Sequence, residues 1–220
     1  MGMARKSDAT RLLLVRHGEV EEGARGRIYG RLDPALAPDG RAQAEGMARV
    51  VAAEHPAAIV TSPSLRARDS AAPLVTALGL VPIVEPQLRE IEFGELEGLT
   101  FAEAERRDPV TWREWMERPG EVRFPGGECW DEIRARAVEA AEAIAAAHPR
   151  EAVALVTHGG VIRALLAEAL ALPASRVFRM EVGFGSLTIL RREPFGWMVE
   201  AVNRRAPSPS PSPPVGERGG

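Results

Sequence analysis

The sequence predicts an α/β fold with three layers, α/β/α, in which helices cover both faces of a mostly parallel central sheet. Three short apolar runs, 12–15, 58–61 and 153–156, have the length and composition of buried strands. Segments with helical spacing or helix-start signals separate them, as expected for parallel strands joined by crossover helices. With 220 residues, 45% hydrophobic and 27% charged, the chain is long enough for one globular domain with its own core.

The first apolar run stops abruptly at Arg16 and His17. Ligands of open α/β sheets collect just beyond the carboxyl ends of the strands, so this pair is well placed for chemistry. The run 153–156 repeats the layout, because it leads to His158 and Gly159 and then to helical spacing. One histidine at a strand end is more often structural than catalytic. Two such ends, each followed by glycine, predict that both histidines face one pocket if the strands share a sheet.

The other elements follow from local signals in chain order. Glycines among charged residues predict a loop at 20–31, and a helix is expected at about 39–54. After the strand 58–61, Ser62 suits the cap of the next helix and Pro63 its first turn. The remaining patterns predict a long Ala-rich helix that ends near residue 147 and strands at 81–85, 177–182, 187–190 and 198–202.

Four segments carry a resemblance to a known family. They are Arg16-His17-Gly18-Glu19, Ser62-x-x-x-Arg66-Ala-x-x-Ser70-Ala, Leu88-x-Glu90 with Gly94-x-x-Glu97-Gly98, and His158-Gly159. In this order they resemble the signature of the histidine phosphatase superfamily, the phosphoglycerate-mutase-like enzymes. The resemblance extends over roughly residues 12–190. It implies a helical insertion, here at about 99–124, over the active site.

The resemblance implies that five residues carry the catalysis. His17 would attack a phosphoryl group, provided that its ring is neutral and a hydrogen bond at the other nitrogen fixes the tautomer. Arg16 and Arg66 would hold the charged oxygens in the transition state, and a protonated His158 would add a third donor. Glu90 would give the leaving alkoxide its proton, and water would then attack the phosphohistidine.

The family pattern also implies which residues contact the substrate. Tyr29 and Gly30 match a pair that touches it, although a Gly/Pro-punctuated connection would explain the stretch 26–36 equally well. The family commonly has an asparagine where Gly23 stands, so this contact is missing or supplied by backbone. The expected substrate-binding residues are Arg16, Gly18, Gly23, Tyr29, Gly30, Arg66, Glu90 and Gly159.

Two of these assignments have a rival nearby. A glutamate-rich stretch is usually solvated surface, and residues two apart in an extended chain share a face, so alternation cannot separate Glu90 from Glu92. Only the family match selects Glu90. Arg68 lies on another face of its helix from Arg66 and is expected to meet solvent.

The insertion at 99–124 has two compatible interpretations. Trp112, Trp115 and Met116 stand at helix-compatible spacing and predict either a packing face or a lid over the pocket. Just beyond it, Cys129 stands where a family Pro-Gly-Gly-Glu-Ser turn has serine, and we expect it to pack without doing chemistry. As the single cysteine of the chain, it fits a reducing cytoplasm.

Composition excludes several other classes of function. A net charge of −3 with interspersed arginines gives no basic face for nucleic acid, and no run is long enough for a signal peptide or membrane span. No metal-binding or nucleotide-binding motif is present, so neither a metal nor a cofactor is expected. The predicted organisation is a short extension (1–10), a cytoplasmic catalytic domain (11–203) and a disordered Pro/Ser-rich tail (204–220).

The predicted function is metal-independent hydrolysis of a small phosphorylated metabolite. Mutases of the family carry extra basic residues, including a lysine, but Lys6 is the only lysine here and acids offset the arginines of the insertion. The loop 26–36 and the short spacing from Arg66 to Glu90 look most like the α-ribazole phosphatase and broad-specificity branch. A phosphoglycerate-type mutase and an inactive phospho-ligand binding module are the alternatives; the complete catalytic set argues against the binding module.

Overall fold

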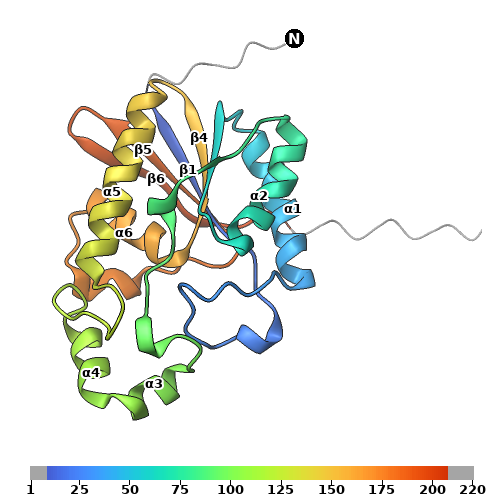
Figure 1. The fold of residues 1–220 in the computed structure, drawn as a ribbon. Coiled ribbons are helices and arrows are strands. Elements are labelled where there is room, and N and C mark those ends of the chain that lie inside the picture. Colours follow the sequence, from blue (N-terminus) through green and yellow to red (C-terminus); the bar gives the residue numbers. More distant parts are fainter. Residues whose placement is uncertain (1–8, 208–220) are drawn as a thin grey trace, which may run out of the picture.

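One mixed sheet forms the centre of the protein (Figure 1). The computed structural model describes residues 9–207, and within them six strands lie in the order β3-β2-β4-β1-β5-β6. β1 to β4 pair with one another in parallel, whereas β5 pairs antiparallel with both β1 and β6. The strands are β1 (Arg11–Arg16), β2 (Ala58–Thr61), β3 (Ile83–Val84), β4 (Ala152–Thr157), β5 (Leu187–Glu193) and β6 (Gly196–Arg204).

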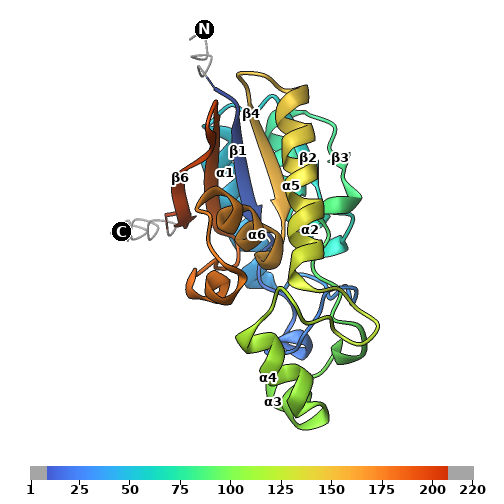
Figure 2. The same ribbon diagram turned by 90° about the vertical axis from the view of Figure 1, so that its left-hand side faces the viewer.

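Helices cover both faces of this sheet, which confirms the predicted three-layer α/β/α class (Figures 1 and 2). α1 (Pro38–Ala52) and α2 (Leu65–Leu78) lie on one face, and α5 (Trp130–Ala147) and α6 (Gly159–Ala169) lie on the other. α3 (Phe101–Arg107) and α4 (Pro109–Glu117) lie beyond the carboxyl end of β1, at the bottom of Figure 1. Short 3₁₀ helices complete the fold: η1 (Glu22–Ala24), η2 (Pro86–Leu88), η3 (Gly94–Leu96) and η4 (Ala174–Arg179).

β1 is buried on both of its faces, which explains its unbroken apolar run. Successive side chains of a strand point to opposite faces. Leu12 and Leu14 therefore join the apolar cluster beneath α5 and α6, while Leu13 and Val15 join the one beneath α1 and α2. Since both layers pack on β1, the end of this strand is held firmly in place.

The strand register brings the two histidine segments together. β1 pairs in parallel with β4 from Arg11 opposite Ala152 to Arg16 opposite Thr157. The next residues, His17 and His158, therefore leave the sheet side by side, as the sequence predicts.

The stretch predicted as a strand at 177–182 is not one; η4 ends within it instead. Val177 is buried in the core, but no strand pairs with this segment. The carbonyls that a strand would offer to a neighbour accept hydrogen bonds from side chains: Met180 O from Arg163, and Val182 O from Arg16. An apolar pattern cannot distinguish these two uses of the backbone.

The start of α2 also differs from its prediction. The helix begins at Leu65, so Ser62 is not its cap and Pro63 precedes its first turn. The carboxylate of Asp33 accepts hydrogen bonds from the backbone N–H groups of Leu65 and Arg66 and thus caps the helix from a distant segment.

The first residues of the predicted tail, 204–206, belong to the folded domain. Arg204 still belongs to β6, where it pairs with Leu187, and Ala206 packs against the cluster beneath α1 and α2. The rest of the predicted tail, from residue 208, and the extension before residue 9 lie outside the described residues.

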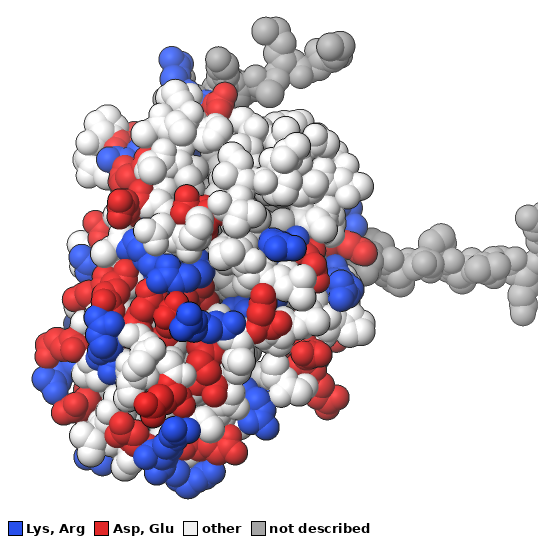
Figure 3. All heavy atoms as spheres, viewed as in Figure 1, with Lys and Arg blue, Asp and Glu red and all other residues white. Residues whose placement is uncertain are grey.

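Charge is mixed over the surface that Figure 3 shows. Arginines and acidic residues alternate there without a continuous basic area, and many form ion pairs such as Arg118 with Glu121 at 3.0 Å. Within residues 9–207, no helix combines the length and apolar character needed to cross a bilayer. Absence of nucleic-acid and membrane partners stays a prediction.

Two glycines let the start of α1 approach the segment after β1. A Cβ on Gly18 would lie 2.2 Å from the carbonyl oxygen of Gly40, and a Cβ on Gly40 would lie 2.0 Å from that of Glu19. Neither distance is possible for a real side chain, so this contact next to His17 requires both glycines.

We expect Gly40→Ala to lower the free energy of unfolding by about 1–3 kcal/mol, because the methyl group would collide with main chain that cannot move alone. Gly46→Ala is the control in the same helix. Its Cβ would meet side-chain atoms alone, the Cβ of Ala206 at 3.2 Å and Arg49 Nη2 at 3.8 Å, and alanine favours a helix by about 0.5–1 kcal/mol. Urea unfolding measures both variants, and equal losses would contradict the close approach at Gly40.

Candidate active site

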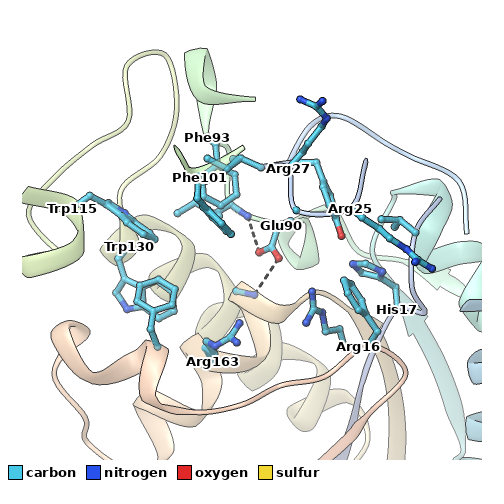
Figure 4. Close-up of a pocket in the computed structure, with 18 of the residues that line it drawn as sticks. Arg16, His17, Arg25, Arg27, Glu90, Phe93, Phe101, Trp115, Trp130 and Arg163 are labelled. Atoms are coloured by element: carbon cyan, nitrogen blue, oxygen red, sulfur yellow. Dashed lines mark hydrogen bonds between the residues drawn. The ribbon is translucent and has the colours of Figure 1, made fainter. Parts of the chain in front are cut away.

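A cavity of about 770 Å³ lies where β1 ends (Figure 4). Arg16 and His17 line it from the end of β1, and Arg163 lines it from α6. Tyr29 comes from the loop before α1, and Glu90 from the segment between η2 and η3. The structure thus brings together segments that lie far apart in the sequence.

His17 is held in the form that a nucleophile needs. Its side chain is buried, and Nδ1 lies 2.8 Å from the carbonyl oxygen of Gly18. Because a carbonyl can only accept, Nδ1 carries the proton and Nε2 keeps its lone pair. Burial lowers the pKa of His17 well below its ordinary value, and the charges of Arg16 and Arg66 lower it further. The ring is therefore neutral at physiological pH.

His158 lies beside it, with the two ring centroids 5.2 Å apart. Its Nε2 shares a hydrogen bond of 2.7 Å with Ser62 Oγ, while Nδ1 is buried and has no hydrogen-bond partner among the described residues. Burial, followed by the charge of Arg66, lowers the pKa of His158 well below its ordinary value. His158 is thus neutral here, and its predicted role as a charged donor requires a bound anion to reverse that effect.

Arg16 and Arg163 place two cations next to each other without acidic partners. Arg16 Nη1 donates to Val182 O at 2.6 Å, and Arg163 Nε donates to Met180 O at 3.1 Å. Burial lowers the pKa of both guanidinium groups. Neither forms a salt bridge with the residues that the structure describes. The carboxylate of Glu90 stabilises both charges without pairing directly with either, and because buried charge is costly, this part of the cavity favours a bound anion.

Gly159 explains how the two guanidinium groups fit together. A Cβ on Gly159 would lie 3.0 Å from Arg163 Nη1 and 3.3 Å from Arg16 Nε. The first turn of α6 must therefore lack a side chain here. Sequence reasoning did not find Arg163, although its position one helical turn after Gly159 was a usable signal.

Arg66 is fully buried in α2 and lies behind the cavity wall. Its Nη1 donates to Leu32 O at 2.8 Å and to Asp33 at 3.1 Å, and its Nη2 donates to Gly30 O at 3.1 Å. Its Cζ lies 5.0 Å from the ring centroid of Tyr29. Arg66 thus fixes the loop that carries Tyr29, and its contact with a phosphate stays a prediction.

Glu90 points into the cavity, between the cationic end and the aromatic side chains (Figure 4). Its carboxylate accepts hydrogen bonds from the backbone N–H groups of Ile91 at 3.0 Å and Gly160 at 3.1 Å. Glu92 does not line the cavity; its carboxylate lies 3.4 Å from Arg89. The tertiary structure thus separates two glutamates that alternation could not.

Arg136, a buried residue of α5, holds the main chain around Glu90. Its guanidinium donates to the carbonyls of Gln87, Arg89 and Glu90 at 2.6–3.0 Å and pairs with Glu128 at 2.9 Å. This network fixes the direction in which the Glu90 side chain leaves the backbone.

Glu97 likewise holds the main chain of the neighbouring loop, the one that carries Tyr29. Its carboxylate accepts hydrogen bonds from the backbone N–H groups of Gly30 at 2.9 Å and Arg31 at 3.0 Å. Tyr29, just before them, lines the cavity, and burial raises the pKa of its hydroxyl. Loop and glutamate segment are therefore held as one unit.

Four glycines predicted to bind substrate do not lie on the cavity wall, and their substrate contacts stay predictions. The N–H of Gly18 donates to Ser70 Oγ, and that of Gly30 donates to Glu97. Gly23 is exposed, and Gly159 packs beneath the two arginines.

The insertion both packs against the domain and lines the cavity. Trp115 is buried and packs on Phe124, with ring centroids 4.9 Å apart, and it lines the cavity together with Trp112 and Met116. Cys129 precedes α5 and does not line the cavity. No cluster of three or more histidine, cysteine, aspartate or glutamate side chains within 9–207 is placed to hold a metal ion.

Comparison with known proteins gives a consistent result. A sequence model described as the histidine phosphatase superfamily (branch 1) matches residues 12–205. The metal-independent phosphoserine phosphatase of Arabidopsis thaliana is 36% identical over 163 residues, which cover 73% of this chain and 68% of that protein. Mycobacterial relatives are 37% identical over 181 residues, 82% of this chain, and the chain spans about half their length.

Solved structures show the same likeness. Mycobacterial glucosyl-3-phosphoglycerate phosphatase has a TM-score of 0.81 at 32% identity, covering 89% of this chain and 99% of that one. A putative α-ribazole-5′-phosphate phosphatase from Escherichia coli also has a TM-score of 0.81, with 90% and 98% covered, but its 22% identity shows a shared fold alone.

The lowered pKa values of His17 and His158 make stability depend on pH. Below about pH 6.5 the unfolded chain binds protons at these histidines, while the folded protein keeps both neutral. The free energy of unfolding therefore falls as the pH drops. Each histidine should contribute a loss on the order of 1 kcal/mol between pH 7.5 and 5.5. Urea unfolding at both pH values measures it.

The variants His17→Gln and His158→Gln should each remove the part of this pH dependence that the replaced histidine contributes. His55→Asn is the control, because His55 is exposed and its positive φ suits asparagine. An unchanged pH dependence in both test variants would show that the two rings are not kept neutral by folding.

Proposed function

Because the chain belongs to the histidine phosphatase superfamily (branch 1), we propose that it hydrolyses phosphomonoesters of a small metabolite through a phosphohistidine at His17, without a metal ion. The observation that carries this proposal is the state of His17, which is neutral, with Nδ1 bound to Gly18 O and Nε2 free. The positive charges of Arg16 and Arg66 act on it, and Arg163 lies next to Arg16.

In the first step, Nε2 of His17 bonds to phosphorus as the bond to the ester oxygen breaks. The charge on the phosphoryl oxygens is met by Arg16 and Arg66, with Arg163 next to Arg16, and by His158 once the dianion favours its protonation. These groups are already in place, so little reorganisation is needed in the transition state.

Glu90 supplies the proton for the leaving oxygen. Its carboxyl group lies at the cavity, and two backbone N–H groups and the Arg136 network orient it. After the alcohol departs, the same carboxylate takes a proton from water as that water attacks the phosphohistidine. This second step releases phosphate and restores His17.

The surroundings of the cavity support a phosphatase over a mutase. None of the insertion's arginines lines the cavity, and three of them face acids: Arg107 pairs with Glu95, Arg118 with Glu121 and Arg123 with Glu132. A second anionic group would thus find no basic pocket in the insertion. An inactive binding module would have no use for a nucleophile with a fixed tautomer.

The relatives do not select one substrate. The names of two include phosphoserine and glucosyl-3-phosphoglycerate, and the α-ribazole phosphatase, which the sequence resembles, shares the fold at low identity. These alcohols differ in size and charge. α-Ribazole phosphate is one candidate, and the leaving group must be inferred from the cavity itself.

We expect purified protein to release phosphate from p-nitrophenyl phosphate at full rate in EDTA, because arginines supply the positive charge. Quenching during turnover should trap an acid-labile phosphate on His17. His17→Ala should lose at least about 10³-fold in kcat, as expected when the nucleophile is removed. Activity that needs a divalent ion, or normal turnover by His17→Ala, would contradict the mechanism; interconversion of phosphoglycerates without phosphate release would indicate a mutase.

We expect Glu90→Gln to slow hydrolysis of alkyl phosphates by about 10²–10⁴-fold, the usual contribution of a positioned acid. The loss on p-nitrophenyl phosphate should be much smaller, because nitrophenolate leaves without a proton. Glu92→Gln is the matched control and should affect both esters mildly and alike. Equal losses on both esters for Glu90→Gln would show that Glu90 shapes the pocket instead.

A further inference from the structure

The aromatic residues of this chain are concentrated at one cavity. The chain has four tryptophans, six phenylalanines and one tyrosine, and eight of these eleven line the cavity. Six of the eight come from the insertion and from segments that lie next to it in space. We call these six the aromatic wall: Phe93, Phe101, Trp112, Trp115, Trp130 and Phe178.

The aromatic wall and the phosphoryl site lie at opposite ends of the cavity. In Figure 4, Trp115, Trp130 and Phe101 lie on one side of Glu90, and Arg16 and His17 lie on the other. Attacking and leaving atoms are roughly in line in phosphoryl transfer, and Glu90 must reach the leaving oxygen. The leaving group of a bound ester therefore extends past Glu90 toward the aromatic wall.

Two of the arginines on the cavity are already engaged by other groups of the protein. Arg25 pairs with Glu19 at 3.1 Å. Arg27 donates to the carbonyls of Gly23 and Gly98. Arg163 lies between the two ends of the cavity: its Nη1 would be 3.0 Å from a Cβ on Gly159, close to Arg16, and its Cζ lies 6.0 Å from the ring centroid of Phe178.

The aromatic wall is preformed and partly exposed. Trp115 is fixed between Phe124 and Phe178, each with its ring centroid 4.9 Å away. Phe101 and Phe178 nevertheless expose 59% and 44% of their surface. Exposed apolar surface concentrated in a cavity marks a binding site, and about 770 Å³ suits a ligand far larger than phosphate alone.

We propose that the natural substrate is a phosphomonoester of a large, apolar alcohol, one that bears an aromatic ring or a long hydrocarbon portion. The ester's phosphoryl group lies at His17 and its apolar portion lies against the aromatic wall. This assignment rests on the proposed phosphatase function and disfavours small hydroxy acids, which would leave most of the aromatic wall uncovered.

A series of primary alkyl phosphates tests the proposal, because their alcohols are similar leaving groups and differ mainly in apolar size. Each buried methylene should raise kcat/KM about fourfold, which corresponds to about 0.8 kcal/mol. Hexyl and 2-phenylethyl phosphate should therefore exceed ethyl phosphate at least about 30-fold, and exceed O-phosphoserine and 3-phosphoglycerate at least about tenfold. Equal values along the series, or a preference for the two acids, would overturn the proposal.

Variants of the exposed wall residues locate the effect. Phe101→Ser and Phe178→Ser should each lower the ratio of kcat/KM for 2-phenylethyl over ethyl phosphate at least about fivefold, because each removes a ring from the apolar contact. Phe195→Ser is the matched control, since Phe195 is 77% exposed between β5 and β6, away from the cavity. An unchanged ratio in both wall variants would contradict the proposal.

Ligand binding without turnover separates this proposal from the proposed function. Three of the four tryptophans line the cavity, so intrinsic fluorescence reports its occupation. 2-Phenylethylphosphonate should bind at least about tenfold more tightly than ethylphosphonate. Selective binding without turnover of any ester would reject the phosphatase and keep the ligand class. Turnover of all esters alike, with equal binding of both phosphonates, would keep the phosphatase and reject the ligand class.

Discussion

Parallel pairing of β1 with β4 is the constraint on which the rest of the site depends. The register that sets Arg16 opposite Thr157 places His17 and His158 at the same edge of the sheet, 5.2 Å apart between ring centroids. A slip by one residue would turn every side chain of β1 to the other face and break both core clusters. Packing on the two faces of β1 therefore determines the position of the nucleophile.

A phosphate can bind beside His17 only if positive charge is buried there. Arg16 and Arg163 form no salt bridge with the described residues; both donate to carbonyls of the segment 180–182, and the carboxylate of Glu90 stabilises their charges. This use of the carbonyls explains why the segment does not join the sheet. Burial lowers the pKa of His17, and the charges of Arg16 and Arg66 lower it further, so cations that attract a phosphate also keep its attacker neutral.

The opposite end of the cavity is lined by aromatic side chains. Arg136 fixes the backbone around Glu90, Glu97 fixes the neighbouring loop that carries Tyr29, and the aromatic wall continues from there. A site with cations at one end, a carboxylic acid in the middle and rings at the other matches a phosphoryl group, an ester oxygen and an apolar alcohol in that order.

The sequence by itself determined the α/β class, most strands and the site segments around His17, Glu90 and His158, because apolar periodicity and short motifs are local signals. Tertiary structure decided what depends on distant partners. Asp33 caps α2 in place of Ser62. Arg163 can lie next to Arg16 because Gly159 has no side chain to separate them. Glu90, and not Glu92, lines the cavity because Arg136 orients its backbone. The aromatic wall likewise exists only after folding, since its rings come from separate segments that no periodicity connects.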